Sequence, residues 1–171
     1  MTQPRPLSQR PWDTLHAAFI LFHIPPVILV DCQAILPAWV FPQFARDILA
    51  FYLRTFRDPS MTPPVRPWMA SFVAAELVLQ LPFFVWGLRA LWRDDARFRP
   101  VSIAYGAHAA TTVWAILWEL GSHLLLPTPI SPSSTQIVSL LLLHIPFFLI
   151  PATMVVRGIS LLNGLRKEKS E

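Results

Sequence analysis

The chain has 171 residues, of which 54% are hydrophobic and only 14% are charged, with a net charge of +4 and a mean hydropathy of +0.48. A soluble domain usually carries about 25% charged residues, so this composition favours an integral membrane protein. A modest charge without a basic block interleaved with aromatics excludes nucleic acid as a partner. The single cysteine, Cys32, excludes a disulfide framework, a structural zinc site and a CxxC redox site.

Four apolar segments are long enough to cross a membrane, because a spanning helix needs about 20 residues. They cover about 12–31, 68–92, 100–124 and 136–162. The alternative, a soluble four-helix bundle, would need a charged outer face on its helices, which these segments lack. We therefore predict an all-α membrane protein whose four-helix transmembrane domain covers residues 12–162, between an N-terminal segment (1–11) and a C-terminal tail (163–171).

Charge in the flanking segments predicts the orientation. An even number of spans leaves both termini on one side of the membrane. Ten Lys and Arg residues lie in the termini and the loop after the second span, against four in the other loops. The positive-inside rule then predicts that both termini are cytosolic. The tail "KEKSE" resembles a KxKxx retrieval signal of the endoplasmic reticulum, with Lys167 and Lys169 as its lysines, and the alternative is an ordinary basic tail.

The first loop contains a candidate surface helix. In "FPQFARDILAFYLRTF", residues 41–56, apolar residues recur at helical spacing and the charges fall on the other face. This pattern predicts an amphipathic helix lying at the membrane surface.

Ionisable and polar residues recur inside the predicted spans, where a charge is costly and usually faces the bundle interior. Glu76 and Gln80 are four residues apart, so we expect them to share a helix face. The other candidates are His16, His23, Asp31, His108, Thr111, Thr112, Glu119 and His144. Together they predict a polar-lined cavity within the bundle. The spacing of the histidines and acids predicts no metal site, and no phosphate-binding or other cofactor motif occurs.

Prolines inside the spans support such a cavity. They are Pro25, Pro26, Pro82, Pro146 and Pro151. Each removes a backbone hydrogen bond and can kink its helix. Kinks in three of the four helices would splay the bundle and leave room for a ligand.

Four motifs resemble one family. "FHIPPVILVDCQAILP" (22–37), "FRDP" (56–59), "AELVLQLPFF" (75–84) and "YGAHAATT" (105–112) are similar to the sigma-2 receptor family of four-helix proteins. That family belongs to the EXPERA superfamily, which also contains the emopamil-binding sterol Δ8–Δ7 isomerases. The resemblance covers roughly residues 10–165 and is weaker in the fourth span, where the family usually has tyrosines in place of His144 and Phe147.

The resemblance implies a multi-pass protein of the endoplasmic reticulum membrane, often a homodimer, whose occluded pocket binds sterols and cationic amphiphiles. Asp31 would pair with a ligand ammonium, and Glu76 would be its hydrogen-bonded neighbour. Two such carboxyls would share a proton and carry about one negative charge. The resemblance also implies that Asp58 holds the first loop in place. Further pocket residues would be Gln80, Tyr105, His108, Thr112 and Phe147.

Three functions are compatible with these residues. The first is a non-enzymatic receptor for sterols or amphiphiles that regulates lipid or protein trafficking. The second is a sterol double-bond isomerase, in which Glu76, Asp31 and His108 would move protons. The third is an adaptor that aids mitochondrial protein targeting from the endoplasmic reticulum. The His, Glu and Trp set of the isomerases does not occur cleanly here, which favours the receptor.

Overall fold

A computed structural model describes residues 5–168, and this part of the chain contains helices and no strand. The long elements are α1 (Pro11–Leu29), α2 (Gln43–Phe56), α3 (Pro67–Ala75), α4 (Leu81–Trp92), α5 (Phe98–Leu125) and α6 (Ser134–Glu168). The short ones are η1 (Leu7–Gln9), η2 (Asp31–Ala34), η3 (Ala38–Val40) and η4 (Glu76–Gln80). Lys169, the second lysine of the predicted retrieval signal, lies outside the described residues.

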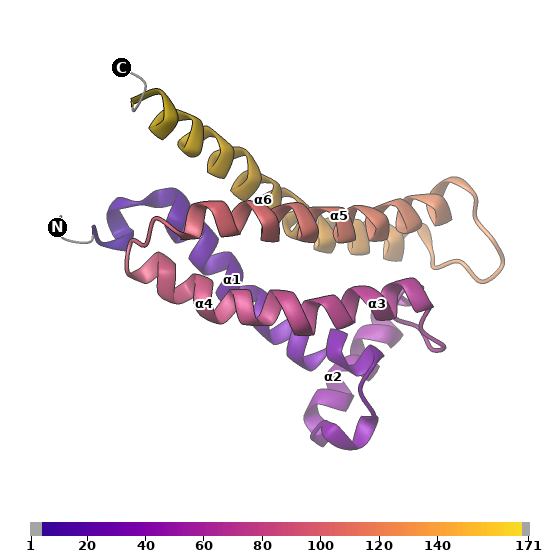
Figure 1. The fold of residues 1–171 in the computed structure, drawn as a ribbon. Coiled ribbons are helices and arrows are strands. Elements are labelled where there is room, and N and C mark those ends of the chain that lie inside the picture. The colour runs from indigo at the N-terminus through magenta and orange to yellow at the C-terminus, as the bar shows by residue number, and fades with distance from the viewer. Residues whose placement is uncertain (1–4, 169–171) are drawn as a thin grey trace.

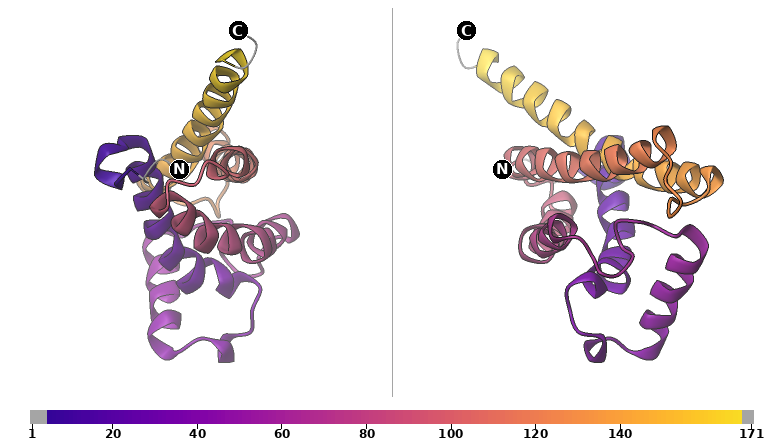
Figure 2. Two further views of the ribbon diagram at one scale, coloured as in Figure 1. Left: turned by 60° about the vertical axis from the view of Figure 1, so that its left-hand side comes forward. Right: turned by 90° about the vertical axis from the view of Figure 1, so that its right-hand side faces the viewer.

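The long helices form a bundle in which α5 and α6 make the most extensive pair (Figure 1). Elements α3, η4 and α4 follow one another as a single rod, and α1 packs against α4. Both termini lie at the same end of the bundle, and α2 lies towards the other end (Figures 1 and 2). The C-terminal half of α6 diverges from the bundle, and the helix contains Pro146 and Pro151.

The predicted helices are confirmed closely. The segment expected at 68–92 is the rod Pro67–Trp92, and the amphipathic segment of the first loop is α2. Proline begins both α1 and α3, because its missing N–H costs nothing at the first helical position. Helix α2 ends where Arg57 adopts a left-handed conformation with φ of 51°.

Three helices of the described chain are long and apolar enough to cross a membrane: Pro11–Ala34, Pro67–Trp92 and Ser134–Asn163. The helix predicted at 100–124 is present as α5, but α5 does not belong to this group. Small and polar residues such as Gly106, His108 and Thr112 dilute its apolar character. The count of four spans and the cytosolic side of the termini therefore stay predictions.

The rod from α3 to α4 contains one wide turn. Residues Glu76–Gln80 form a π-helical turn, in which the N–H of Leu81 donates to the carbonyl of Glu76, five residues earlier. Pro82 follows directly and cannot donate to the carbonyl four residues before it. Single π-helical turns are frequent at functional sites.

Glycines allow α5 and α6 to approach closely. A Cβ on Gly106 of α5 would lie 2.5 Å from the carbonyl oxygen of Pro151 on α6. A Cβ on Gly158 of α6 would lie 2.5 Å from a side-chain carbon of Ile103 on α5. Small residues at helix crossings are the usual means of close packing in membranes. The α5–α6 pair therefore depends on two positions without a side chain.

A buried arginine ties the start of α1 to the end of α4. Arg10 is 5% exposed and donates to the Leu91 carbonyl at 2.7 Å and to Asp13 at 2.7 Å. It also lies 3.3 Å from Asp94, which accepts hydrogen bonds from Arg5. Partial desolvation works to raise the pKa of Asp94, but the hydrogen bonds from Arg5 and the charge of Arg10 lower it overall.

Candidate ligand-binding cavity

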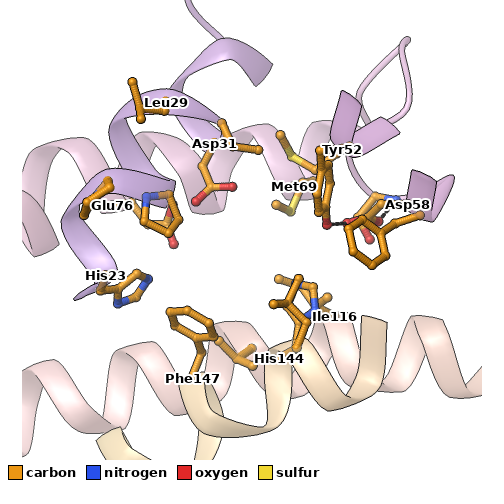
Figure 3. Close-up of a pocket in the computed structure, with 18 of the residues that line it drawn as sticks. His23, Leu29, Asp31, Tyr52, Asp58, Met69, Glu76, Ile116, His144 and Phe147 are labelled. Atoms are coloured by element: carbon orange, nitrogen blue, oxygen red, sulfur yellow. Dashed lines mark hydrogen bonds between the residues drawn. The ribbon is translucent and has the colours of Figure 1, made fainter. Parts of the chain in front are cut away.

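A cavity of about 420 Å³ lies among the helices and the first loop (Figure 3). Its size falls within the range of about 300–1,000 Å³ typical of small-molecule sites. The walls are mostly apolar and include Leu29, Ile48, Met61, Met69, Ile116 and Leu143. Pro25 and Pro26 of α1, which were predicted to kink this helix, also line it.

Two carboxyl side chains lie on one wall of this apolar cavity. Asp31 begins η2 directly after α1, and Glu76 begins the π-helical turn. Both line the cavity, and Figure 3 shows them on the side formed by the N-terminal half of the chain. One carboxyl oxygen of Glu76, Oε2, is buried and has no hydrogen-bond partner in the described chain. A buried polar atom without a partner is costly, so this wall can accept a donor from a bound molecule.

A third acid, Asp58, holds the first loop over the cavity. Its carboxylate accepts hydrogen bonds from the Tyr52 hydroxyl at 2.5 Å and from the backbone N–H of Ser60 at 2.8 Å. Its carbonyl accepts a third, from the Thr62 hydroxyl at 2.6 Å. Burial, with the neighbouring charge of Asp58, raises the pKa of Tyr52, so the phenol stays protonated and donates. Asp58 thus both fixes the loop and lines the cavity.

The opposite wall comes from α6. Figure 3 shows Phe147 and His144 facing Asp31 across the cavity. The Phe147 ring meets the His23 ring edge-on at 4.6 Å between centroids. His144 places Nδ1 2.8 Å from the Leu140 carbonyl oxygen. This wall therefore combines an aromatic surface with one polar ring.

Four residues expected in the pocket lie outside this cavity: Gln80, Tyr105, His108 and Thr112. Gln80 ends the π-helical turn and is 2% exposed. Tyr105 stacks on Phe83 at 4.2 Å between centroids. Thr112 donates to its own helix, at the Ala109 carbonyl. None of the four lines the cavity that Asp31 lines, and their role in ligand binding stays a prediction.

Sequence reasoning did not assign Tyr52 to the site, although it lines the cavity and anchors Asp58. A tyrosine on the apolar face of an amphipathic helix was the available signal. His23 and His144 were recognised as intramembrane polar groups, but spacing along single helices could not show that they border the same cavity as Asp31. The rotation of each helix about its own axis, relative to its neighbours, decides which side chains face the cavity.

Glu119 lies outside the main cavity. It pairs with Arg66, lies 3.7 Å from His123, and these residues line a second cavity beside Trp68 and Trp118. This network joins the start of α3 to the end of α5. Among the described residues, His, Cys, Asp and Glu side chains do not form a group of three or more that could hold a metal ion.

Comparison with known proteins identifies the family. The family model described as EBP: EXPERA (EXPanded EBP superfamily) matches residues 44–158. Sigma intracellular receptor 2 of Xenopus tropicalis is 34% identical over 141 residues, which cover 81% of this chain and 82% of the relative. The human protein of the same name is 35% identical over 113 residues, 66% of this chain and 64% of that protein.

A fungal protein is similar as well. Efficient mitochondria targeting-associated protein 19 of Schizosaccharomyces pombe is 32% identical over 120 residues, 67% of this chain and 63% of the relative. The motifs around Asp31, Glu76 and His108 had indicated the same relationship. The chain therefore belongs to the EXPERA (EXPanded EBP superfamily) family and, within it, to the sigma-2 receptor family.

Proposed function

We propose that this protein binds a sterol or a cationic amphiphile in the cavity between α1, the π-helical turn and α6. The observation that carries the proposal is the position of Asp31 and Glu76 on one wall of an otherwise apolar cavity. An apolar cavity with a few convergent polar groups is the usual form of a small-molecule site. A long apolar ligand with one polar end matches this division of surfaces.

The two acids define the polar end of the ligand. A carboxylate in apolar surroundings is strongly disfavoured unless a cation or hydrogen-bond donors pair with it. An ammonium group would supply both the charge and the donors, and a sterol hydroxyl would supply one donor. Glu76 Oε2, which is buried without a partner in the described chain, is the acceptor that such a group would satisfy.

The cellular role we propose is regulation of lipid or protein trafficking at the endoplasmic reticulum membrane. The basic tail with Lys167 and Lys169 supports this location. A second candidate is an adaptor role in mitochondrial protein targeting, which the name of the fungal relative favours. A third is sterol double-bond isomerisation. His108 would not serve it in this cavity, because His108 lies outside the lining residues.

Binding and turnover measurements on the purified protein separate these functions. Tritiated octadecylamine, a simple cationic amphiphile, and a Δ8 sterol would be added to protein in lipid nanodiscs. We expect binding of octadecylamine without conversion of the sterol. Asp31→Asn and Glu76→Gln should each weaken octadecylamine binding by about 10- to 100-fold, because a hydrogen bond to a charged group is lost.

Matched substitutions provide the controls. Asp47→Asn removes an exposed acid of α2, and Glu119→Gln removes an acid of the second cavity. Both should leave octadecylamine affinity within about 2-fold of the wild type, because neither acid lines the main cavity. Equal losses in the control variants would contradict the assignment of the cavity. Conversion of the Δ8 sterol would contradict the receptor function and support the isomerase. If neither molecule binds, the adaptor role is the candidate that stands.

A further inference from the structure

A backbone contact defines which ring nitrogen of His144 carries a hydrogen in the cavity wall. Its Nδ1 lies 2.8 Å from the carbonyl oxygen of Leu140, one turn earlier on α6. A carbonyl oxygen only accepts hydrogen bonds, so Nδ1 carries the proton and donates. In the neutral imidazole the other nitrogen, Nε2, then has a free lone pair. The helix itself therefore fixes His144 as a hydrogen-bond acceptor on the Nε2 side.

That acceptor is available to a ligand. His144 is half-buried and lines the cavity, and its Nε2 makes no hydrogen bond to the side chains and backbone that the structure describes. His23, the other histidine of the wall, is enclosed by the rings of Phe147, Phe84 and Phe19 at 4.6, 5.1 and 5.2 Å between centroids. His144 is therefore the more exposed of the two histidines that line the cavity.

Most of the other polar groups of the cavity either have partners or lie across from His144, and the Ser60 hydroxyl, unpartnered in the described chain, belongs to the first loop beside Asp58. Asp58 already accepts from Tyr52 and Ser60. Asp31 and Glu76 lie on the facing wall (Figure 3). The cavity thus offers an acidic wall for a cation and, opposite it, the Nε2 side of the His144 ring. A ligand that carries an ammonium and a nearby hydroxyl would satisfy both.

We propose that His144 determines specificity by accepting a hydrogen bond from a ligand hydroxyl, so that the cavity prefers amphiphilic amino alcohols to simple amines. This inference rests on the proposed function, because the ammonium is held by Asp31 and Glu76. It adds a second recognition point that α6 provides.

Two probes with the same chain length isolate the hydroxyl. Sphinganine and octadecylamine both have 18 carbons and an ammonium, and only sphinganine has hydroxyls beside it. Tritiated samples of each would be titrated into the full-length protein in phosphatidylcholine nanodiscs, with empty nanodiscs subtracted. We expect sphinganine to bind on the order of 10-fold more tightly to the wild type, the value of one net hydrogen bond.

Variants then assign the preference to His144. His144→Phe should reduce the preference for sphinganine over octadecylamine to less than about 2-fold, because the acceptor is lost and the acids remain. His144→Gln keeps an acceptor oxygen and should retain part of the preference. His123→Phe, in the second cavity, should retain all of it. Melting temperatures of all variants would show that they are folded.

The outcomes separate this inference from the function beneath it. If octadecylamine binds but the wild type shows no preference for sphinganine, the inference is wrong and the receptor function stands. A preference that survives in folded His144→Phe also overturns it. If neither amphiphile binds the wild type, both the inference and the proposed function fail.

Discussion

The contact between α5 and α6 gives a sharp test of the fold, because two glycines of the same helix differ completely in their surroundings. A Cβ on Gly106 would lie 2.5 Å from the Pro151 carbonyl oxygen and 3.0 Å from a methyl carbon of Val155. A Cβ on Gly121 would meet nothing within 4 Å. Gly106→Ala and Gly121→Ala therefore make the same chemical change on one helix with opposite expected results.

The magnitudes follow from two opposing terms. Replacing glycine by alanine inside a helix favours the folded state by up to about 1 kcal/mol. Overpacking typically costs about 1–3 kcal/mol, and the upper end applies at Gly106 because the clashing atom belongs to the backbone of α6. We therefore expect Gly106→Ala to destabilise the fold by about 2 kcal/mol and Gly121→Ala to stabilise it by up to about 1 kcal/mol.

Thermal unfolding in detergent measures both variants. The single cysteine, Cys32, is buried, so a thiol-reactive fluorogenic dye will report when the bundle opens. A change of 1 kcal/mol shifts the melting temperature of a chain of this size by about 2–4 °C. Gly106→Ala should therefore melt about 4–8 °C below the wild type, and Gly121→Ala should melt at or slightly above it.

One result would refute this reasoning. If Gly106→Ala melts at or above the wild-type temperature, α5 and α6 do not approach each other at Pro151 as the structure has them. If Gly121→Ala instead loses stability as strongly as Gly106→Ala, the loss comes from glycine replacement in general and not from the close contact.

Two further predictions concern the loop and the N-terminal ion pairs. Tyr52→Phe should cost about 1–3 kcal/mol of stability, because it removes one of the two hydrogen-bond donors to the buried Asp58 carboxylate. Tyr105→Phe should change stability by less than about 0.5 kcal/mol, since the Tyr105 hydroxyl has no hydrogen-bond partner in the described chain. Because the pKa of Asp94 is lower in the folded protein than in the unfolded chain, ionised Asp94 stabilises the fold. This contribution is fully present above the unfolded-chain pKa of about 3.9, and it is lost as the pH falls through the folded-state pKa. The melting temperature should therefore fall more between pH 5 and pH 3 in the wild type than in Asp94→Asn. The free-energy contribution behind this difference should stay below about 1 kcal/mol, because Arg5 is largely exposed.

Specific outcomes would contradict these two predictions. Equal melting temperatures for Tyr52→Phe and the wild type would mean that the Tyr52 hydrogen bond does not hold the loop. Parallel acid profiles for Asp94→Asn and the wild type would mean that Asp94 gains nothing from its arginine partners on folding.

Helix positions were largely predictable from the chain because their causes are local. Apolar runs of sufficient length, bounded by polar turns and by prolines such as Pro11 and Pro67, give the bounds of α1 and of the rod Pro67–Trp92. The amphipathic pattern of residues 41–56 likewise located α2. The motifs that contain Asp31 and Glu76 also indicated the family.

The sequence by itself thus determined the class of protein, the helices and the family, since composition, periodicity and motif act along one segment at a time. Only the tertiary structure decided which polar groups meet. The packing of α2 and α6 brought Tyr52 and His144 to the cavity that Asp31 and Glu76 also line. Their positions depend on the rotation of each helix relative to its neighbours, which no single segment encodes.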